Sequence, residues 1–134
     1  MTNLQVRVYQ NGDVSWIEIG GEIEMSNAPQ LREILLDACS GERPRLVVDL
    51  SRVPFIDSTG IGTLVIGLKR AREKGGTFAL LSPQPRVRRV FEISGLMPAL
   101  AVFESPEDVQ QYAVGDLNKI PQGARNQQGE GEDD

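Results

Sequence analysis

Apolar and polar positions alternate along the first twenty residues, which indicates a β-hairpin. Residues 4–8 alternate in the manner of a strand with one buried face. Asn11 and Gly12 follow, and because both residue types tolerate positive φ they mark a tight turn. The apolar run over 14–19 is the expected return strand, and two successive glycines end it.

Beyond residue 25 the spacing of apolar positions switches between the helical and the strand period. Helices are expected from Ser26 to about Ala38, from about Thr59 to Lys74, over 85–93 and over 106–113, and strands over 46–50, 77–81 and 99–103. The nearly continuous apolar run over 46–50 is typical of a central parallel strand covered on both faces. The alternation predicts an α/β fold with right-handed crossovers and a mostly parallel mixed sheet of about five strands and four helices.

The last twenty residues differ in composition from the rest of the chain. From Gly115 onward the sequence is rich in Gly, Gln, Asn and acids without apolar periodicity, so a single domain over 1–114 and a disordered acidic tail over 115–134 are expected. The tail has five acids and two bases, a net charge of -3, and residues 1–114 have 14 acids and 12 bases, a net charge of -2. A nearly neutral body predicts neither a nucleic acid nor an anionic membrane as partner.

Histidine is absent from the 134 residues, and this excludes several kinds of site. A Ser-His-Asp or Cys-His catalytic set and a His-containing zinc site cannot be built. Cys39 is the single cysteine, so it forms no intramolecular disulfide and is expected to be a small core residue. The N-terminus lacks a signal-peptide pattern and the longest apolar stretch, over 61–68, is far shorter than a membrane span. A cytoplasmic location is therefore predicted.

One loop-to-helix segment brings Asp57, Ser58 and Thr59 to the start of a predicted helix. Such side chains accept hydrogen bonds from the unpaired N–H groups of a first turn, so Ser58 as a simple N-cap is one interpretation. Gly60 and Gly62 lie in or next to that turn, where each costs about 0.5–1 kcal/mol relative to alanine. Because glycine also lets a partner's backbone or a phosphate come close, a functional site at this turn is the other interpretation.

Three stretches of the sequence resemble a known family. One resembles the phosphorylation-site signature of the anti-sigma factor antagonists, which are members of the STAS family: Phe55-Ile56-Asp57-Ser58-Thr59-Gly60-Ile61-Gly62. A second is similar to the family's Gly-Glu-Leu-Asp entry to the first helix: Gly21-Glu22-Ile23-Glu24. Ser82-Pro83 with residues 87–96 is similar to its third-helix block. The resemblance covers about residues 3–113 in the same order and spacing, and it implies the STAS fold.

The resemblance assigns roles residue by residue. It implies that Ser58 accepts a phosphate and that Asp57, Thr59, Gly60 and Gly62 form the surface around it that a kinase contacts. Thr59 carries a second hydroxyl, so it is the alternative acceptor.

Glu24 is the remaining partner-binding residue that the resemblance implies. It stands where the family usually has aspartate, in a loop expected to lie beside the phosphorylation loop.

The resemblance also implies a function without catalysis or a cofactor. The unphosphorylated form would bind an anti-sigma factor that is also an ATP-binding serine/threonine kinase, and so free a sigma factor. Phosphorylation of Ser58 would end the binding, and a serine phosphatase would restore it. A monomer suits this role. Two alternatives stay open: a STAS scaffold subunit of a stress-sensing complex or of an ABC-type lipid transporter, and an enzyme or nucleotide-binding domain of another kind.

Overall fold

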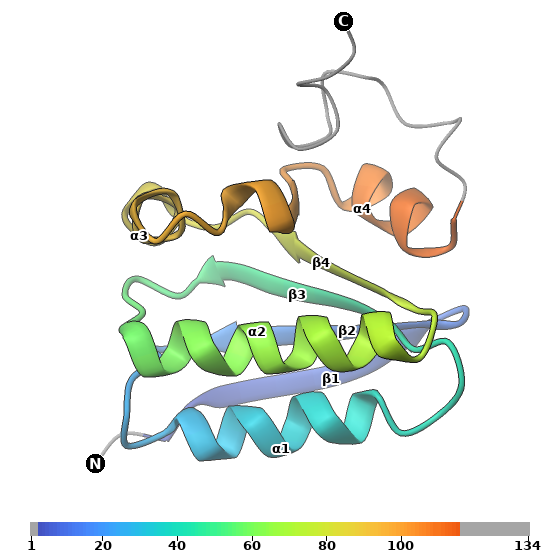
Figure 1. The fold of residues 1–134 in the computed structure, drawn as a ribbon, viewed down its shortest axis with the longest axis horizontal. Helices are drawn as coiled ribbons and strands as arrows, with labels where there is room; N and C mark the ends of the chain where they lie inside the picture. Colours follow the sequence, from blue (N-terminus) through green and yellow to red (C-terminus); the bar gives the residue numbers. More distant parts are fainter. Residues whose placement is uncertain (1–2, 116–134) are drawn as a thin grey trace, which may run out of the picture.

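The computed structural model describes residues 3–115, so the tail predicted over 115–134 lies almost wholly outside the described residues. Within this range the chain forms five strands, four α-helices and one 3-10 helix (Figure 1). In chain order these are β1 (Gln5–Asn11), β2 (Val14–Gly20), α1 (Ala28–Ala38), β3 (Arg45–Arg52), α2 (Ser58–Glu73), β4 (Thr77–Leu81), α3 (Pro85–Ile93), η1 (Met97–Ala99), β5 (Ala101–Phe103) and α4 (Pro106–Ala113).

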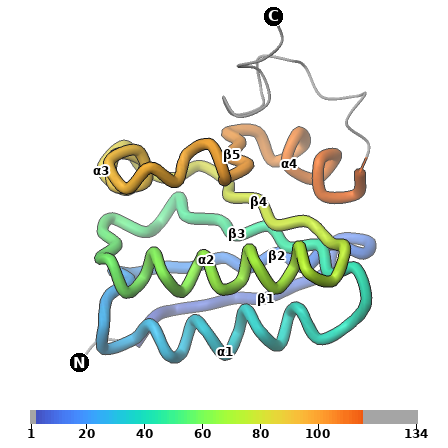
Figure 2. Tube along the Cα trace, in the orientation of Figure 1, coloured from blue at the N-terminus to red at the C-terminus, as the bar shows by residue number. Residues whose placement is uncertain are grey.

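The strands form one mixed sheet in the order β1-β2-β3-β4-β5. Only β1 and β2 pair antiparallel, as a hairpin that places Asn11 opposite Val14. The other neighbours, β2 with β3, β3 with β4 and β4 with β5, pair parallel. Figure 2 shows this order, from β1 near α1 to β5 beside α4. The predicted mostly parallel sheet is confirmed.

Two hydrophobic clusters, one on each face of the sheet, hold the layers together. The larger lies under α1, α2 and α3, and includes Leu35, Leu64 and Phe91. The smaller lies under α4 and includes Trp16 and Phe103. Because side chains of a strand alternate between faces, β3 and β4 each contribute to both clusters, which explains their nearly continuous apolar sequences.

Helix α2 lies close to both α1 and β4 because residue 67 is a glycine. A Cβ atom at Gly67 would lie 3.1 Å from Leu35 Cδ1 and 3.0 Å from Phe78 Cε2. Few neighbours tolerate contacts that short, so glycine lets the helix settle against the layer beneath it. This packing fixes the axis of α2 and thereby the position of its N-terminus.

The structure differs from the expected elements at four places. Helix α1 begins at Ala28 rather than Ser26. Helix α2 begins at Ser58 rather than Thr59. Residues 97–99 form η1, and β5 begins at Ala101, so the strand predicted from Ala99 is shorter. Strand β1 is an edge strand, and Val8 on it is 48% exposed rather than buried.

One further expectation for the fold is confirmed. Cys39 is fully buried, and burial raises the pKa of its thiol. No helix within residues 3–115 is long and apolar enough to cross a membrane.

Candidate functional site

Two loops lie side by side at the end of the sheet where α2 begins. The loop between β2 and α1 and the loop between β3 and α2 are joined by a parallel bridge between Ile23 and Ile56. The Ile23 N–H donates to the Phe55 carbonyl at 2.9 Å, and the Asp57 N–H donates to the Ile23 carbonyl at 3.1 Å. The bridge therefore brings the segment that contains Glu24 beside the segment that contains Ser58.

Asp57 joins both loops to the first turn of α2 through its carboxylate. It is the N-cap residue, and its Oδ1 accepts a hydrogen bond from the Gly60 N–H at 2.8 Å. Its Oδ2 accepts from the Met25 N–H at 3.0 Å. Because each carboxylate oxygen binds a different segment, Asp57 fixes the position of the turn relative to the neighbouring loop.

Ser58 is the first residue of α2 and is exposed, as is Thr59 after it. The interpretation of Ser58 as the N-cap is therefore wrong. Of the three consecutive polar residues, Asp57 has the extended backbone and the side-chain hydrogen bond of a cap. The first turn of α2 contains no acidic side chain. The structure thus presents two adjacent hydroxyls at the positive end of a helix dipole, outside the cap.

The two glycines of the motif occupy different environments. Gly60 is buried, and a Cβ atom there would lie 2.7 Å from both Ile23 Cγ2 and Ile56 Cγ1. The expectation that Gly60 belongs to the exposed surface is corrected, because the residue seats α2 on the loop bridge. Gly62 is exposed, and a Cβ atom there would meet nothing within 4 Å. Packing within the chain therefore explains why residue 60 is a glycine, but it does not explain the glycine at position 62.

Glu24 shapes the loop beside the site. Its carboxylate accepts hydrogen bonds from the Ser26 hydroxyl and from the Ser26 N–H, the latter at 2.9 Å. These bonds favour the charged form and lower the pKa of Glu24 below its usual value. The Glu24 N–H in turn donates to Asn27 Oδ1 at 2.9 Å, so the whole turn is internally braced.

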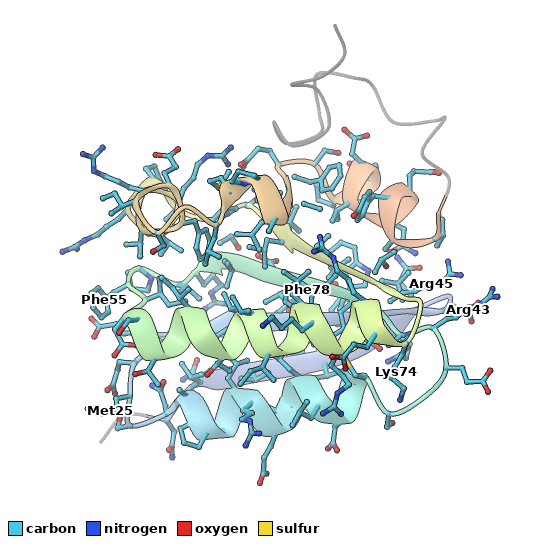
Figure 3. All side chains as sticks on the ribbon, viewed as in Figure 1. Met25, Arg43, Arg45, Phe55, Lys74 and Phe78 are labelled. Carbon is cyan, nitrogen blue, oxygen red and sulfur yellow. The ribbon has the colours of Figure 1, made fainter. Side chains whose placement is uncertain are left out.

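Two apolar side chains flank the site and were not predicted as part of it. Met25 is 69% exposed and Phe55 is 37% exposed. Figure 3 shows both at the end of the molecule where α2 begins. The sequence did not distinguish them from Ile23 and Ile56, apolar residues of the same two loops that are buried.

Metal binding finds no support in the part of the chain that the structure describes. Among residues 3–115, no three His, Cys, Asp or Glu side chains are grouped so that they could hold a metal ion.

Comparison with known proteins places this geometry in a family. The profile of the STAS domain matches residues 5–109. The anti-sigma-B factor antagonist of Bacillus subtilis is 33% identical over 78% of this chain and 95% of its own length. An anti-sigma factor antagonist from Mycobacterium paratuberculosis superimposes with a TM-score of 0.74 at 25% identity, over 83% of this chain and 94% of that one. The antagonist SpoIIAA in its unphosphorylated form gives 0.70 at 25% identity, over 83% and 97%. The chain belongs to the STAS-domain family of anti-sigma factor antagonists.

Proposed function

We propose that the chain is an anti-sigma factor antagonist controlled by phosphorylation of Ser58. In its unphosphorylated form it binds an anti-sigma factor that is also a serine kinase, and the sigma factor held by that kinase is released. The kinase then transfers the γ-phosphoryl group of ATP to Ser58 Oγ, the hydroxyl loses its proton and ADP leaves. A serine phosphatase later removes the phosphate. The chain itself catalyses neither step.

The observation that carries this proposal is the position of Ser58. It is exposed at the first position of α2, and the neighbouring Asp57 already supplies the cap. Its hydroxyl is therefore not needed for the cap, and a kinase can reach it. The relatives named anti-sigma-B factor antagonists support the partner class. The structural relative SpoIIAA, described in an unphosphorylated form, supports the modification.

The site accounts for a switch that leaves the fold intact. Phosphorylation adds about -1.5 to -2 charges at pH 7. A phosphate at a helix N-terminus is stabilised by the dipole and free N–H groups by about 0.3–1 kcal/mol, so α2 remains formed. In a protein interface, however, a desolvated charge without a partner is costly. Release of the kinase therefore follows from the contact surface rather than from unfolding.

The first test identifies the partner and the acceptor. Tagged protein is used to recover partners from its source organism, the recovered anti-sigma factor is purified, and intact mass is measured after incubation with ATP. Wild type should gain one phosphate, and Ser58→Ala should gain none while still binding. A phosphate on Ser58→Ala would assign the acceptor to Thr59 instead. Recovery of an ABC-type ATPase without a kinase would contradict the proposal in favour of a scaffold subunit.

The second test measures the switch by titration calorimetry. Affinity for the kinase should fall from wild type to Ser58→Asp and again to the phosphorylated protein, because aspartate supplies only part of the charge and bulk of a phosphate. Each tenfold rise in dissociation constant corresponds to about 1.4 kcal/mol. Equal affinity of all three forms would contradict control by charge at this position.

A further inference from the structure

We infer that Met25 and Phe55 are the apolar anchors of the contact with the anti-sigma factor, which presents an apolar recess with a cationic rim. This rests on the proposed function and adds to it the residues and the chemistry of the partner's surface. Neither side chain is polar. Met25 lies on the loop between β2 and α1, and Phe55 lies on the loop between β3 and α2 that leads to Ser58.

Hydrogen bonds fix the backbone at both anchor residues before any partner arrives. The Met25 N–H donates to Asp57 Oδ2 at 3.0 Å, and the Phe55 carbonyl accepts from the Ile23 N–H at 2.9 Å. Figure 3 shows both residues at the end where α2 begins. Because these loop segments are already tied together, binding through them pays little of the ordering entropy that a mobile loop would cost.

Their exposure has no explanation within the described fold. Large apolar side chains that are exposed within residues 3–115 are Val8, Met25, Phe55, Ile93 and Val114. Two of these five belong to the two bridged loops, and Met25 is bonded to Asp57, which directly precedes the exposed Ser58. Apolar side chains that gather on a polar surface mark contact sites, and a few such anchors carry most of the energy of an interface.

The charges around the anchors define the rim of the partner's surface. Residues 20–27 and 51–59 contain three acids (Glu22, Glu24 and Asp57) and one base (Arg52), a net charge of -2. Complementary interfaces place charges of opposite sign against each other. Lys or Arg side chains around an apolar recess therefore fit this surface, and an acidic partner surface would be repelled.

The anchors also explain why one phosphate is enough to release the partner. When Met25 and Phe55 are buried against the partner, they exclude water from the loops beside Ser58. A new charge in a dry contact costs far more than one in a wet contact. The penalty of a charge at residue 58 should therefore depend on the two anchors.

The experiment compares variants in calorimetric binding to the purified anti-sigma factor recovered with wild type. Met25→Gln and Phe55→Ala should each weaken binding at least tenfold, while Met25→Leu, which stays apolar at similar size, should remain within threefold. Val114→Ala is the matched control, because Val114 is also exposed, at 40%, but lies far from the site. The carbonyl of the preceding Ala113 accepts hydrogen bonds from Arg45 and Thr77, the first residues of β3 and β4, at the opposite end of the sheet. Thermal melts within a few degrees of wild type show that the variants are folded.

A double-mutant cycle then tests the coupling to Ser58. The loss of affinity caused by Ser58→Asp should be at least threefold smaller in the Phe55→Ala background than in wild type. Anchor variants that bind like Val114→Ala, while wild type still binds and is phosphorylated, would overturn this inference and leave the proposed function standing. A wild type that binds no anti-sigma factor would overturn both.

Discussion

Helices α2 and α4 both have a side-chain cap for the unpaired N–H groups of their first turn, but their first turns differ in charge. At α4 the Ser105 hydroxyl accepts from the Asp108 N–H at 3.2 Å, Pro106 opens the helix, and Glu107 and Asp108 place negative charge in the first turn. At α2 the cap is equally well formed by Asp57, but no acidic residue follows in the first turn.

The difference separates a structural helix start from one that can receive a charge. The carboxylates of Glu107 and Asp108 already interact with the dipole of α4, and they would repel a phosphate placed among them. The first turn of α2 offers two exposed hydroxyls, at Ser58 and Thr59, and leaves the favourable end of its dipole available beyond Asp57. The start of α2, which lacks acidic side chains in its first turn, is thus the one suited to modification.

The largest effect is expected at the glycine that seats α2. Gly60→Ala should lower the free energy of unfolding by about 3 kcal/mol, because its Cβ would press on the stiff, β-branched side chains of Ile23 and Ile56. Urea denaturation of Gly60→Ala beside Gly62→Ala measures this. Gly62 has open space, so its alanine variant should gain about 0.5–1 kcal/mol. Equal effects at both sites would remove the distinction between the buried and the exposed glycine.

The next largest effect is the loss of stability when the N-cap residue of α2 or of α4 is replaced. Asp57→Ala should cost about 2 kcal/mol and Ser105→Ala about 1 kcal/mol, because Asp57 holds Met25 as well as the helix start. Chemical denaturation of both variants tests the order. If Ser105→Ala proves the more destabilising, the second hydrogen bond of Asp57 contributes nothing measurable.

A smaller effect is expected from charge at residue 58. Ser58→Ala should change the free energy of unfolding by less than about 0.5 kcal/mol, because Ser58 does not cap the helix. Ser58→Asp should raise it by about 0.3–1 kcal/mol through the dipole. Ser94→Asp is the control, since Ser94 is the C-cap of α3 and the same charge there should destabilise. A lower melting temperature for Ser58→Asp would indicate a switch that unfolds the helix start.

The smallest effect concerns the loop that Glu24 braces. Because the pKa of Glu24 is lowered in the folded state, its contribution to stability is present above the ordinary value of 4.5 and is lost as the pH falls through the lowered value. Wild type should therefore melt slightly above Glu24→Gln at pH 7, and the gap should close at acidic pH. Glu33→Gln, at an exposed position of α1, controls for loss of one charge. If the difference in melting temperature between wild type and Glu24→Gln grows in acid, the pKa of Glu24 is raised rather than lowered in the folded state.

The order of the elements could be predicted from sequence because each carries its own period of apolar residues. The mixed sheet and the separate faces of α1 and α2 follow from that pattern. The cap of α2 could not be assigned, because Asp57, Ser58 and Thr59 are all suitable residue types and only backbone geometry separates them.

The burial of Gly60 and the exposure of Met25 were also beyond sequence reasoning. Both depend on the bridge between Ile23 and Ile56, which joins positions 33 residues apart. A local pattern identifies glycine in a helix start, but it does not say which neighbour that glycine faces. The structure brings the residues predicted for the site together at one end of the sheet, while their division into packing, capping and exposed residues required the fold.

The single tryptophan gives this molecule a built-in optical reporter that is separate from its hydroxyls. Trp16 lies under α4, where its indole N–H donates to Gln110 Oε1 at 2.7 Å, and Gln110 Nε2 donates to the Asn11 carbonyl at 3.1 Å. Its emission therefore senses whether the last helix is docked on its face of the sheet. If Trp16 fluorescence stays constant during phosphorylation of the protein and changes only on denaturation, phosphorylation at residue 58 does not alter the packing of α4 on the opposite face of the sheet.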